Sequence, residues 1–256
     1  MLALIPPPFS NKIGPVHIYS LTMLLAIFTA RFLILHFAKK YNKTEIIDFV
    51  KQNELYVIVS SIIGARVYHL FTGYDWDNGV FGTIEIWQGG ISIWGALIGG
   101  IASTWWLSRS DKLDFSIIFD LSVVGVVAGH AIGRWGNYFN QELYGKPLDS
   151  KWFWALKVYD NTYHPTFLYE FLGCSIILIL LIVLLKKNIV GLTTSVYLMT
   201  YGLLRAGMEL LRIDHSTYVG PLRFNFFVAM VMFIIGFLLF IKAIKRSESW
   251  HTKQST

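Results

Sequence analysis

The chain has 256 residues, of which 54% are apolar and 15% are charged, whereas charged residues make up about 25% of an ordinary soluble domain. This composition favours residence in a membrane. The 22 Lys and Arg residues exceed the 16 Asp and Glu residues, giving a net charge of +6. That charge suits an anionic lipid surface and does not by itself indicate nucleic-acid binding. The single cysteine, Cys174, excludes an intramolecular disulfide framework and any metal site that needs several cysteines.

Seven apolar windows follow one another along the chain, each close to the roughly 20 residues that a helix needs to cross a bilayer. They cover approximately residues 17 to 38, 52 to 72, 91 to 108, 115 to 132, 166 to 185, 189 to 210 and 224 to 243. They leave no large segment outside the membrane. We therefore predict an all-α integral membrane protein with about seven transmembrane helices, forming a single domain over residues 1–256. Three consecutive prolines, residues 6–8, stand where a signal peptide would need its hydrophobic core, so we expect no cleaved signal sequence.

Lys and Arg are unevenly distributed between the two sides of such a bundle. One side has Lys39, Lys40, Lys43, Lys51, Arg109, Lys112, Lys186, Lys187, Lys242, Lys245, Arg246 and Lys253 in short connections and the C-terminal tail. The other side has Lys12, Arg134, Lys146, Lys151, Lys157, Arg212 and Arg223, spread over longer segments. Because cationic loops are retained in the cytoplasm, we predict that the N-terminus is outside and the C-terminus is cytoplasmic. The longest connection, residues 133–165, then faces outward as a motif and a small extracytoplasmic cap.

Three further arginines, Arg31, Arg66 and Arg205, fall inside the predicted spans. A charge there costs about 2.5–3.5 kcal/mol on insertion scales, so these side chains must face protein, water or a ligand. Arg31 and Arg66 lie within reach of an end of their spans, and snorkelling to the interface is an equally good interpretation for both.

Arg205 belongs to a charged group with Glu209 and Arg212, at spacings of four and three that place all three on one helix face. An internally neutralised Arg–Glu pair is one interpretation. However, one Glu between two Arg leaves a net positive face, which suits an anionic group at the outer leaflet.

A second polar concentration runs from Gly133 to Gly145, at the outer end of the fourth window. If the helix continues, it places His130, Arg134, Asn137 and Gln141 in one stripe. Arginine offers planar, permanently charged donors to a phosphate, and amide side chains can orient its ester oxygens. An arginine at the lipid headgroup level would explain Arg134 alone but not the whole run.

Two more segments carry possible site residues. His164 and Pro165 open the fifth window, and they place Glu170 about one and a half turns inside it, where a carboxylate must be paired or protonated. A histidine that caps the helix is the simpler alternative for His164. The segment 89–100 has five glycines in twelve residues, which indicates close helix packing.

Together these segments resemble the bacterial prolipoprotein diacylglyceryl transferase family. The resemblance runs from Tyr19 through 64–66, the Gly89–Gly90 segment and the run 133–145, and then through 164–170 and 205–212. It therefore covers nearly the whole chain. The family's seven-span, N-out topology agrees with the topology predicted above.

The resemblance implies transfer of a diacylglyceryl group from phosphatidylglycerol to the lipobox cysteine thiol of a prolipoprotein, which forms a thioether and releases glycerol phosphate in the first step of lipoprotein maturation. It implies a multi-pass protein of the bacterial cytoplasmic membrane, with its active site toward the outer leaflet. The partners are phosphatidylglycerol, prolipoprotein signal peptides and membrane lipids. We expect no nucleic acid, cofactor or metal. The nucleophile belongs to the substrate, so Cys174 is interpreted as a small core residue.

By resemblance, Arg134 is the family's phosphate-binding arginine and Arg205 its second essential arginine. We place Arg134, Arg205, His164, Glu170 and Tyr19 in the catalytic group. The expected phosphatidylglycerol-binding residues are Arg134, Asn137, Asn140, Glu142, Gly145, Arg66, Glu209 and Arg212.

The general base stays open, because many family members have a histidine in the third-span motif where this chain has Trp94. His164, Glu170, Glu142 and Glu209 are candidates. His164 is the first choice, because its ordinary pKa is near neutral and it lies on the outward side. The alternative function is a multi-span transporter of a small anionic substrate, since intramembrane Arg and Glu can line a pathway. That alternative predicts internal repeats, which the sequence does not show convincingly.

Overall fold

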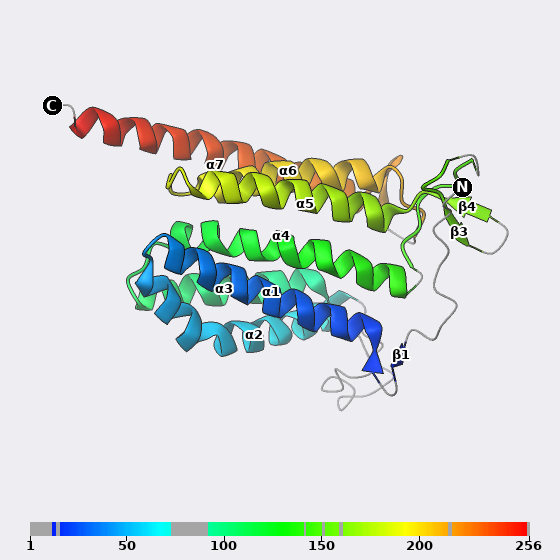
Figure 1. Ribbon diagram of the computed structural model, residues 1–256, viewed down its shortest axis with the longest axis horizontal. Coiled ribbons are helices and arrows are strands. Elements are labelled where there is room, and N and C mark those ends of the chain that lie inside the picture. Colours follow the sequence, from blue (N-terminus) through cyan, green and yellow to red (C-terminus); the bar gives the residue numbers. More distant parts are fainter. Residues whose placement is uncertain are drawn as a thin grey trace. The chain divides into compact units, whose positions relative to one another are not determined.

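The computed structural model describes residues 12–13, 16–72, 92–140, 142–149, 152–158, 161–214 and 217–254. These residues contain seven helices (Figure 1): α1 (Ile18–Lys40), α2 (Thr44–Thr72), α3 (Ile93–Ser110), α4 (Phe115–Phe139), α5 (Thr166–Leu185), α6 (Leu192–Glu209) and α7 (Phe224–Gln254). Short antiparallel strand pairs join β1 (Lys12–Ile13) to β2 (Val16–His17), β3 (Leu156–Val158) to β4 (Asn161–Tyr163), and β5 (Tyr218–Val219) to β6 (Leu222–Arg223). The predicted all-helical architecture is confirmed at this level.

Each apolar window corresponds to one helix, but several helices continue beyond the windows. α2 begins at Thr44, α4 runs to Phe139 and α7 runs to Gln254, whereas the windows placed these ends at residues 52, 132 and 243. A window ends where polar side chains begin. Backbone hydrogen bonds of a helix continue through polar residues, so helix length was underestimated at these three ends.

Five helices, α1, α2, α4, α5 and α7, are long and apolar enough to cross a membrane. The other two, α3 and α6, have 18 residues each and include glycine, hydroxyl and ionisable side chains. Helices that pack against protein tolerate such residues. The protein is therefore a helical integral membrane protein.

The chain forms two compact units, residues 1–36 with 119–256, and residues 37–118. In the first unit α6 packs along α7, and α5 lies beside α6 (Figure 1). α5 and α6 are neighbours in sequence and run in opposite directions. As a result, the first turns of α5 lie beside the last turns of α6, where the polar residues of interest occur.

A buried carboxylate on α4 determines where α6 begins. Asp120 Oδ2 accepts a hydrogen bond from the Gly191 N–H at 2.6 Å, and its Oδ1 accepts bonds from the Thr194 N–H and hydroxyl at 2.8 Å each. The first N–H groups of a helix have no partner within the helix. Asp120 lies 74 positions before Thr194 in the sequence and supplies that partner. It thereby connects α4 to α6.

The second unit contains α2 and α3, which pack with their backbones close together. A Cβ atom at Gly95 would lie 2.1 Å from the Gly64 carbonyl oxygen and 2.5 Å from the Tyr68 Cβ, so only glycine fits this approach. The expected close helix packing is therefore present at Gly95. Gly89 and Gly90 lie outside the described residues.

Candidate active site

Four arginines and three carboxylates form one ion-pair network at one end of the first unit. The network lies where α4 and α6 end and α5 and α7 begin. Its members are Arg134, Arg205, Arg212, Arg223, Glu170, Glu209 and Asp214.

Glu170 is the point on which three of the arginines converge. Its carboxylate lies 2.7 Å from Arg134 Nη2, 3.1 Å from Arg205 Nη1 and 3.7 Å from Arg212 Nη1. The residue is only 2% exposed. A buried carboxylate needs charged or hydrogen-bonding partners, and guanidinium groups from α4, α6 and the segment after α6 supply them here.

The second carboxylate, Glu209, lies one turn beyond Arg205 on α6. It pairs with Arg205 through one oxygen and with Arg223 Nε through the other, at 3.1 Å. The predicted pairing of Arg205 with Glu209 along the helix is confirmed.

Arg212 comes after the end of α6, and it pairs with Asp214 as well as with Glu170. Arg212 Nε lies 2.8 Å from Asp214 Oδ1, and Arg223 Nη2 lies 2.9 Å from Asp214 Oδ2. Burial acts to raise the pKa of the Asp214 carboxyl, but the hydrogen bonds and charges of Arg212 and Arg223 outweigh it, so the pKa lies below its ordinary value. Asp214 is therefore an anion at neutral pH.

A second chain of contacts links Arg134 to the segment after α4. Arg134 Nη1 donates to Asn137 Oδ1 at 3.4 Å, and Asn137 Nδ2 donates to Glu142 Oε1 at 2.8 Å. Since α4 continues to Phe139, His130, Arg134 and Asn137 share one helix face, as the spacing predicts. Gln141, the fourth residue of the predicted stripe, lies outside the described residues.

Tyr19 packs against α4 within this group. A Cβ atom at Gly136 would lie 2.9 Å from Tyr19 Cδ2, so the tyrosine ring contacts the helix backbone between Arg134 and Asn137. α1 thus brings Tyr19 against α4 at Gly136, two residues after the predicted phosphate-binding arginine.

Gly145 joins three chain segments that border the network. It forms an antiparallel bridge with Arg212, and its N–H donates to the His164 carbonyl at 3.0 Å. A Cβ atom at Gly145 would lie 2.6 Å from the His164 Cβ. Any larger residue would push the Gly145 segment away from His164.

His164 lies between this junction and the start of α5. Its Nδ1 is 3.1 Å from the Tyr169 hydroxyl, which orients the ring. Burial lowers the pKa of the imidazole below its ordinary value, so His164 is neutral at pH 7 and able to accept a proton.

Asn140 and Arg66 are the remaining predicted site residues. Asn140 closes the last turn of α4, where its N–H donates to the Gly136 carbonyl at 2.9 Å. Arg66 is buried in α2 of the second unit, which also contains Trp94 on α3. Among the described residues, no three His, Cys, Asp or Glu side chains are grouped as a metal ion would require.

Two network residues were not predicted as site residues, Arg223 and Asp214. From the sequence, Arg223 was placed only among the cations of the outward side, and Asp214 was given no role. Both residues fall between the sixth and seventh apolar windows, where helical periodicity gives no signal. The position of Arg223 directly before an apolar window was the one available indication.

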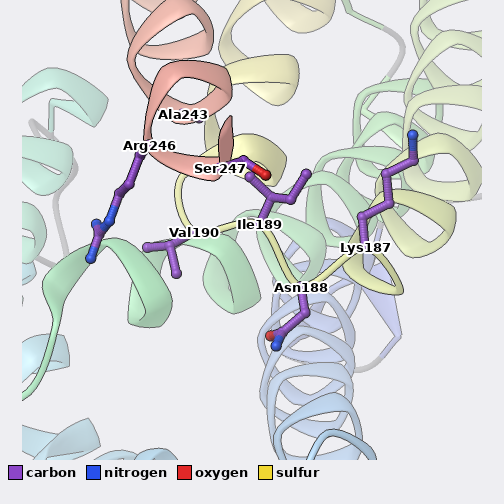
Figure 2. A pocket seen from close by; sticks show the side chains of 7 residues that line it. All are labelled: Lys187, Asn188, Ile189, Val190, Ala243, Arg246 and Ser247. Carbon is purple, nitrogen blue, oxygen red and sulfur yellow. The ribbon is translucent and has the colours of Figure 1, made fainter. Parts of the chain in front are cut away.

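A separate pocket of about 400 Å³ lies at the opposite end of α5 and α6. It is lined by Lys187, Asn188, Ile189, Val190, Ala243, Arg246 and Ser247 (Figure 2). Figure 2 shows that the Lys187 and Arg246 side chains extend in different directions and do not converge on one point. The pocket therefore lacks the converging cations that distinguish the ion-pair network.

The chain is similar to known proteins over most of its length. Residues 8–242 match the model of a family described as prolipoprotein diacylglyceryl transferase. The chain belongs to this family. The seven residues of the ion-pair network all lie within the part that matches the family.

Three relatives, each named phosphatidylglycerol–prolipoprotein diacylglyceryl transferase, illustrate the similarity. The Bifidobacterium adolescentis protein is 34% identical over 94% of this chain and 80% of its own length. The Finegoldia magna protein is 34% identical over 89% of this chain and 91% of its own length. The Streptomyces griseus protein is 31% identical over 95% of this chain and 79% of its own length.

Proposed function

We propose that this protein transfers the diacylglyceryl group of phosphatidylglycerol to the lipobox cysteine thiol of prolipoproteins, the first step of lipoprotein maturation. Membership of the prolipoprotein diacylglyceryl transferase family and the names of the relatives support this assignment. The main structural observation in its favour is that Arg134, Arg205 and Arg212 all converge on Glu170, at one end of the helices of the first unit.

The charges of the network suit a phosphodiester. The residues linked by the ion pairs described above comprise four arginines and three carboxylates, which leaves one positive charge. Phosphatidylglycerol carries one negative charge on its phosphate. In the proposed reaction the thiol sulfur forms a bond to the glycerol carbon, the bond from that carbon to the phosphate oxygen breaks, and its electron pair leaves with glycerol phosphate. Fixed cations stabilise the charge that develops on this leaving group.

The residues around the arginines have supporting roles in this proposal. Asn137 and Glu142 hold Arg134 through the hydrogen-bond chain, and Gly145, which bridges to Arg212, can approach His164 closely because it has no side chain. We keep Asn140, Glu209 and Arg66 as proposed phosphatidylglycerol-site residues, and Tyr19 as a residue of the proposed catalytic group. Tyr19 is favoured by its contact with α4 at Gly136, two residues after Arg134.

We propose His164 as the group that receives the thiol proton, because the thiolate is the reactive form of cysteine and His164 is neutral at pH 7. Glu170 is a poorer candidate. Its oxygens face three arginines at 2.7–3.7 Å, and such partners stabilise the charged form of a carboxylate.

We further propose seven membrane spans with the N-terminus outside, the C-terminus in the cytoplasm and the active site toward the outer leaflet of the bacterial cytoplasmic membrane. The distribution of Lys and Arg supports this orientation. The carbon–oxygen bond that breaks lies at the headgroup, so a site near the membrane surface can receive the lipid laterally.

The proposal is tested with purified protein, phosphatidylglycerol labelled in its diacylglycerol part and a lipobox peptide. We expect wild-type protein to label the peptide thiol, and Arg134→Ala to lower the rate about 10²–10³-fold, the usual effect of losing one charge-stabilising donor. Arg246→Ala, at the far end of α7, is the matched control and should transfer normally. Folded wild-type protein that binds the lipid but never modifies the thiol would contradict the transferase assignment.

A further inference from the structure

Arg223 is the one arginine of the network that does not contact Glu170 directly. It ends β6, immediately before α7, and is only 4% exposed. Its Nε lies 3.1 Å from Glu209 Oε2, while its Nη2 lies 2.9 Å from Asp214 Oδ2 and donates to the Asp214 carbonyl at 3.0 Å. One guanidinium therefore holds two carboxylates that come from different segments.

These two carboxylates are the ones that hold the phosphate-site arginines. Glu209 pairs with Arg205, and Asp214 pairs with Arg212. Since Arg205 and Arg212 both reach Glu170, the six residues form a closed ring of alternating charge. Its order is Arg223, Glu209, Arg205, Glu170, Arg212, Asp214 and back to Arg223.

We infer that Arg223 is a positioning residue, which closes this ring and so holds Arg205 and Arg212 where the proposed reaction needs them. The inference rests on the proposed function, because it assigns a task to the same site. A planar guanidinium presents donors in a rigid fork, so it can bind carboxylates on two sides at fixed angles. An ammonium group is a point charge and cannot reproduce that geometry.

Removing Arg223 acts on the site in two ways. Glu209 and Asp214 each keep only one of their two arginine partners in the ring, so they draw Arg205 and Arg212 toward themselves and away from incoming phosphate. The network also changes from four arginines and three carboxylates to three of each, and its excess positive charge disappears. Both effects weaken phosphatidylglycerol binding, and neither involves the lipobox peptide.

The test compares Arg223→Met and Arg223→Lys with wild type in the transfer assay, with each substrate varied in turn. Residues that hold the ligands of a metal site in place typically contribute about 10- to 100-fold to activity, and we take the same order for a residue that holds two arginines. We therefore expect Arg223→Met to lower kcat/KM by about 10- to 100-fold, to raise KM for phosphatidylglycerol and to leave KM for the peptide within about twofold. Arg223→Lys restores the charge and should recover part of the loss. Arg246→Met, also on α7, is the control that should behave as wild type.

Displacement of a fluorescent phosphatidylglycerol gives a second measurement that does not depend on transfer. Weaker lipid binding by folded Arg223→Met or Arg223→Lys protein supports the inference. A loss of maximal rate with both KM values unchanged would indicate a merely structural role and overturn it, as would wild-type binding and transfer by folded Arg223→Lys. If wild-type protein binds the lipid without transferring it, the proposed function fails, and lipid binding by the variants still decides the role of Arg223.

Discussion

At the scale of single residues, Glu170 shows how one buried carboxylate can organise a site. It is buried among three guanidinium groups that would repel one another in its absence. Breaking a buried ion pair by removing one partner typically costs about 3–5 kcal/mol, because the other charge is left uncompensated. Glu170 therefore keeps the three arginines together, which the proposed phosphate site requires.

His164 provides a test of proton transfer at the same scale. We expect His164→Ala to lower kcat about 10²-fold, within the usual range for a general base, and to change phosphatidylglycerol binding much less. The wild-type rate should fall as pH drops through the lowered pKa of His164, because a protonated imidazole cannot accept the thiol proton.

Rate–pH profiles of wild type and His164→Ala measure this directly. The fall in rate assigned to His164 should be missing in the variant. Tyr169→Phe, which removes the hydroxyl 3.1 Å from His164 Nδ1, serves as a milder variant. Wild-type turnover in His164→Ala protein would eliminate His164 as the base.

Cys174 takes the structural role that its sequence context predicts. It lies in α5 and has no exposed surface. A thiol that solvent and substrate do not reach cannot serve as a nucleophile. This agrees with a reaction in which the peptide substrate supplies the sulfur.

At the scale of secondary-structure elements, the ends of the helices matter more than their middles. α6 begins where Asp120 binds its first N–H groups, and it ends at Glu209 inside the ion-pair network. The same helix therefore carries a structural anchor at one end and Arg205 near the other. The position of Arg205 along the bundle depends on where α6 begins.

Asp120 gives a prediction for this element. Asp120→Ala leaves the Gly191 and Thr194 donors without the partner they now have, and loss of a helix cap costs about 0.5–2 kcal/mol. We expect a lower unfolding temperature in detergent micelles. Thr194→Val removes one of the three hydrogen bonds and should have a smaller effect.

The measurement is thermal unfolding followed by circular dichroism, together with transfer activity at a temperature where both variants are folded. An Asp120→Ala protein as stable as wild type would show that this cap contributes no measurable stability. Equal destabilisation by Thr194→Val would assign the effect to the hydroxyl bond alone.

At the scale of the whole molecule, orientation in the membrane decides which substrates reach the site. We expect Lys157→Cys, in β3, to be labelled on intact cells by a membrane-impermeant maleimide, and Lys43→Cys, between α1 and α2, to be labelled only after the cells are opened. Both are made in a Cys174→Ala background. Labelling of Lys43→Cys on intact cells, with protection of Lys157→Cys, would reverse the proposed topology.

The single domain over residues 1–256 stays a prediction. The structure describes two compact units, and the predicted outward segment 133–165 belongs to the first, together with the ion-pair network. The unit of residues 37–118 carries Arg66 and Trp94, the position at which this chain departs from many family members.

Local patterns in the sequence were enough to predict the helices and some of the pairs of polar residues within them. Apolar runs predicted the helices, since burial in lipid requires about 20 apolar residues. Helical spacing placed Arg134 with Asn137 and Arg205 with Glu209, because residues three and four apart share a face. These features depend on near neighbours in the chain, so the sequence alone predicts them.

Tertiary structure decided which faces meet. The pairing of Glu170 with Arg205, 35 residues away, the binding of Arg223 to Glu209 and Asp214, and the capping of α6 by Asp120 all join distant segments. Helical periodicity predicts that a residue lies on a polar face of its helix. Which residues that face contacts depends on the packing of several helices at once. That is why Arg134, Arg205 and Arg212 were recognised from the sequence, while Arg223 and the ring that it closes required the structure.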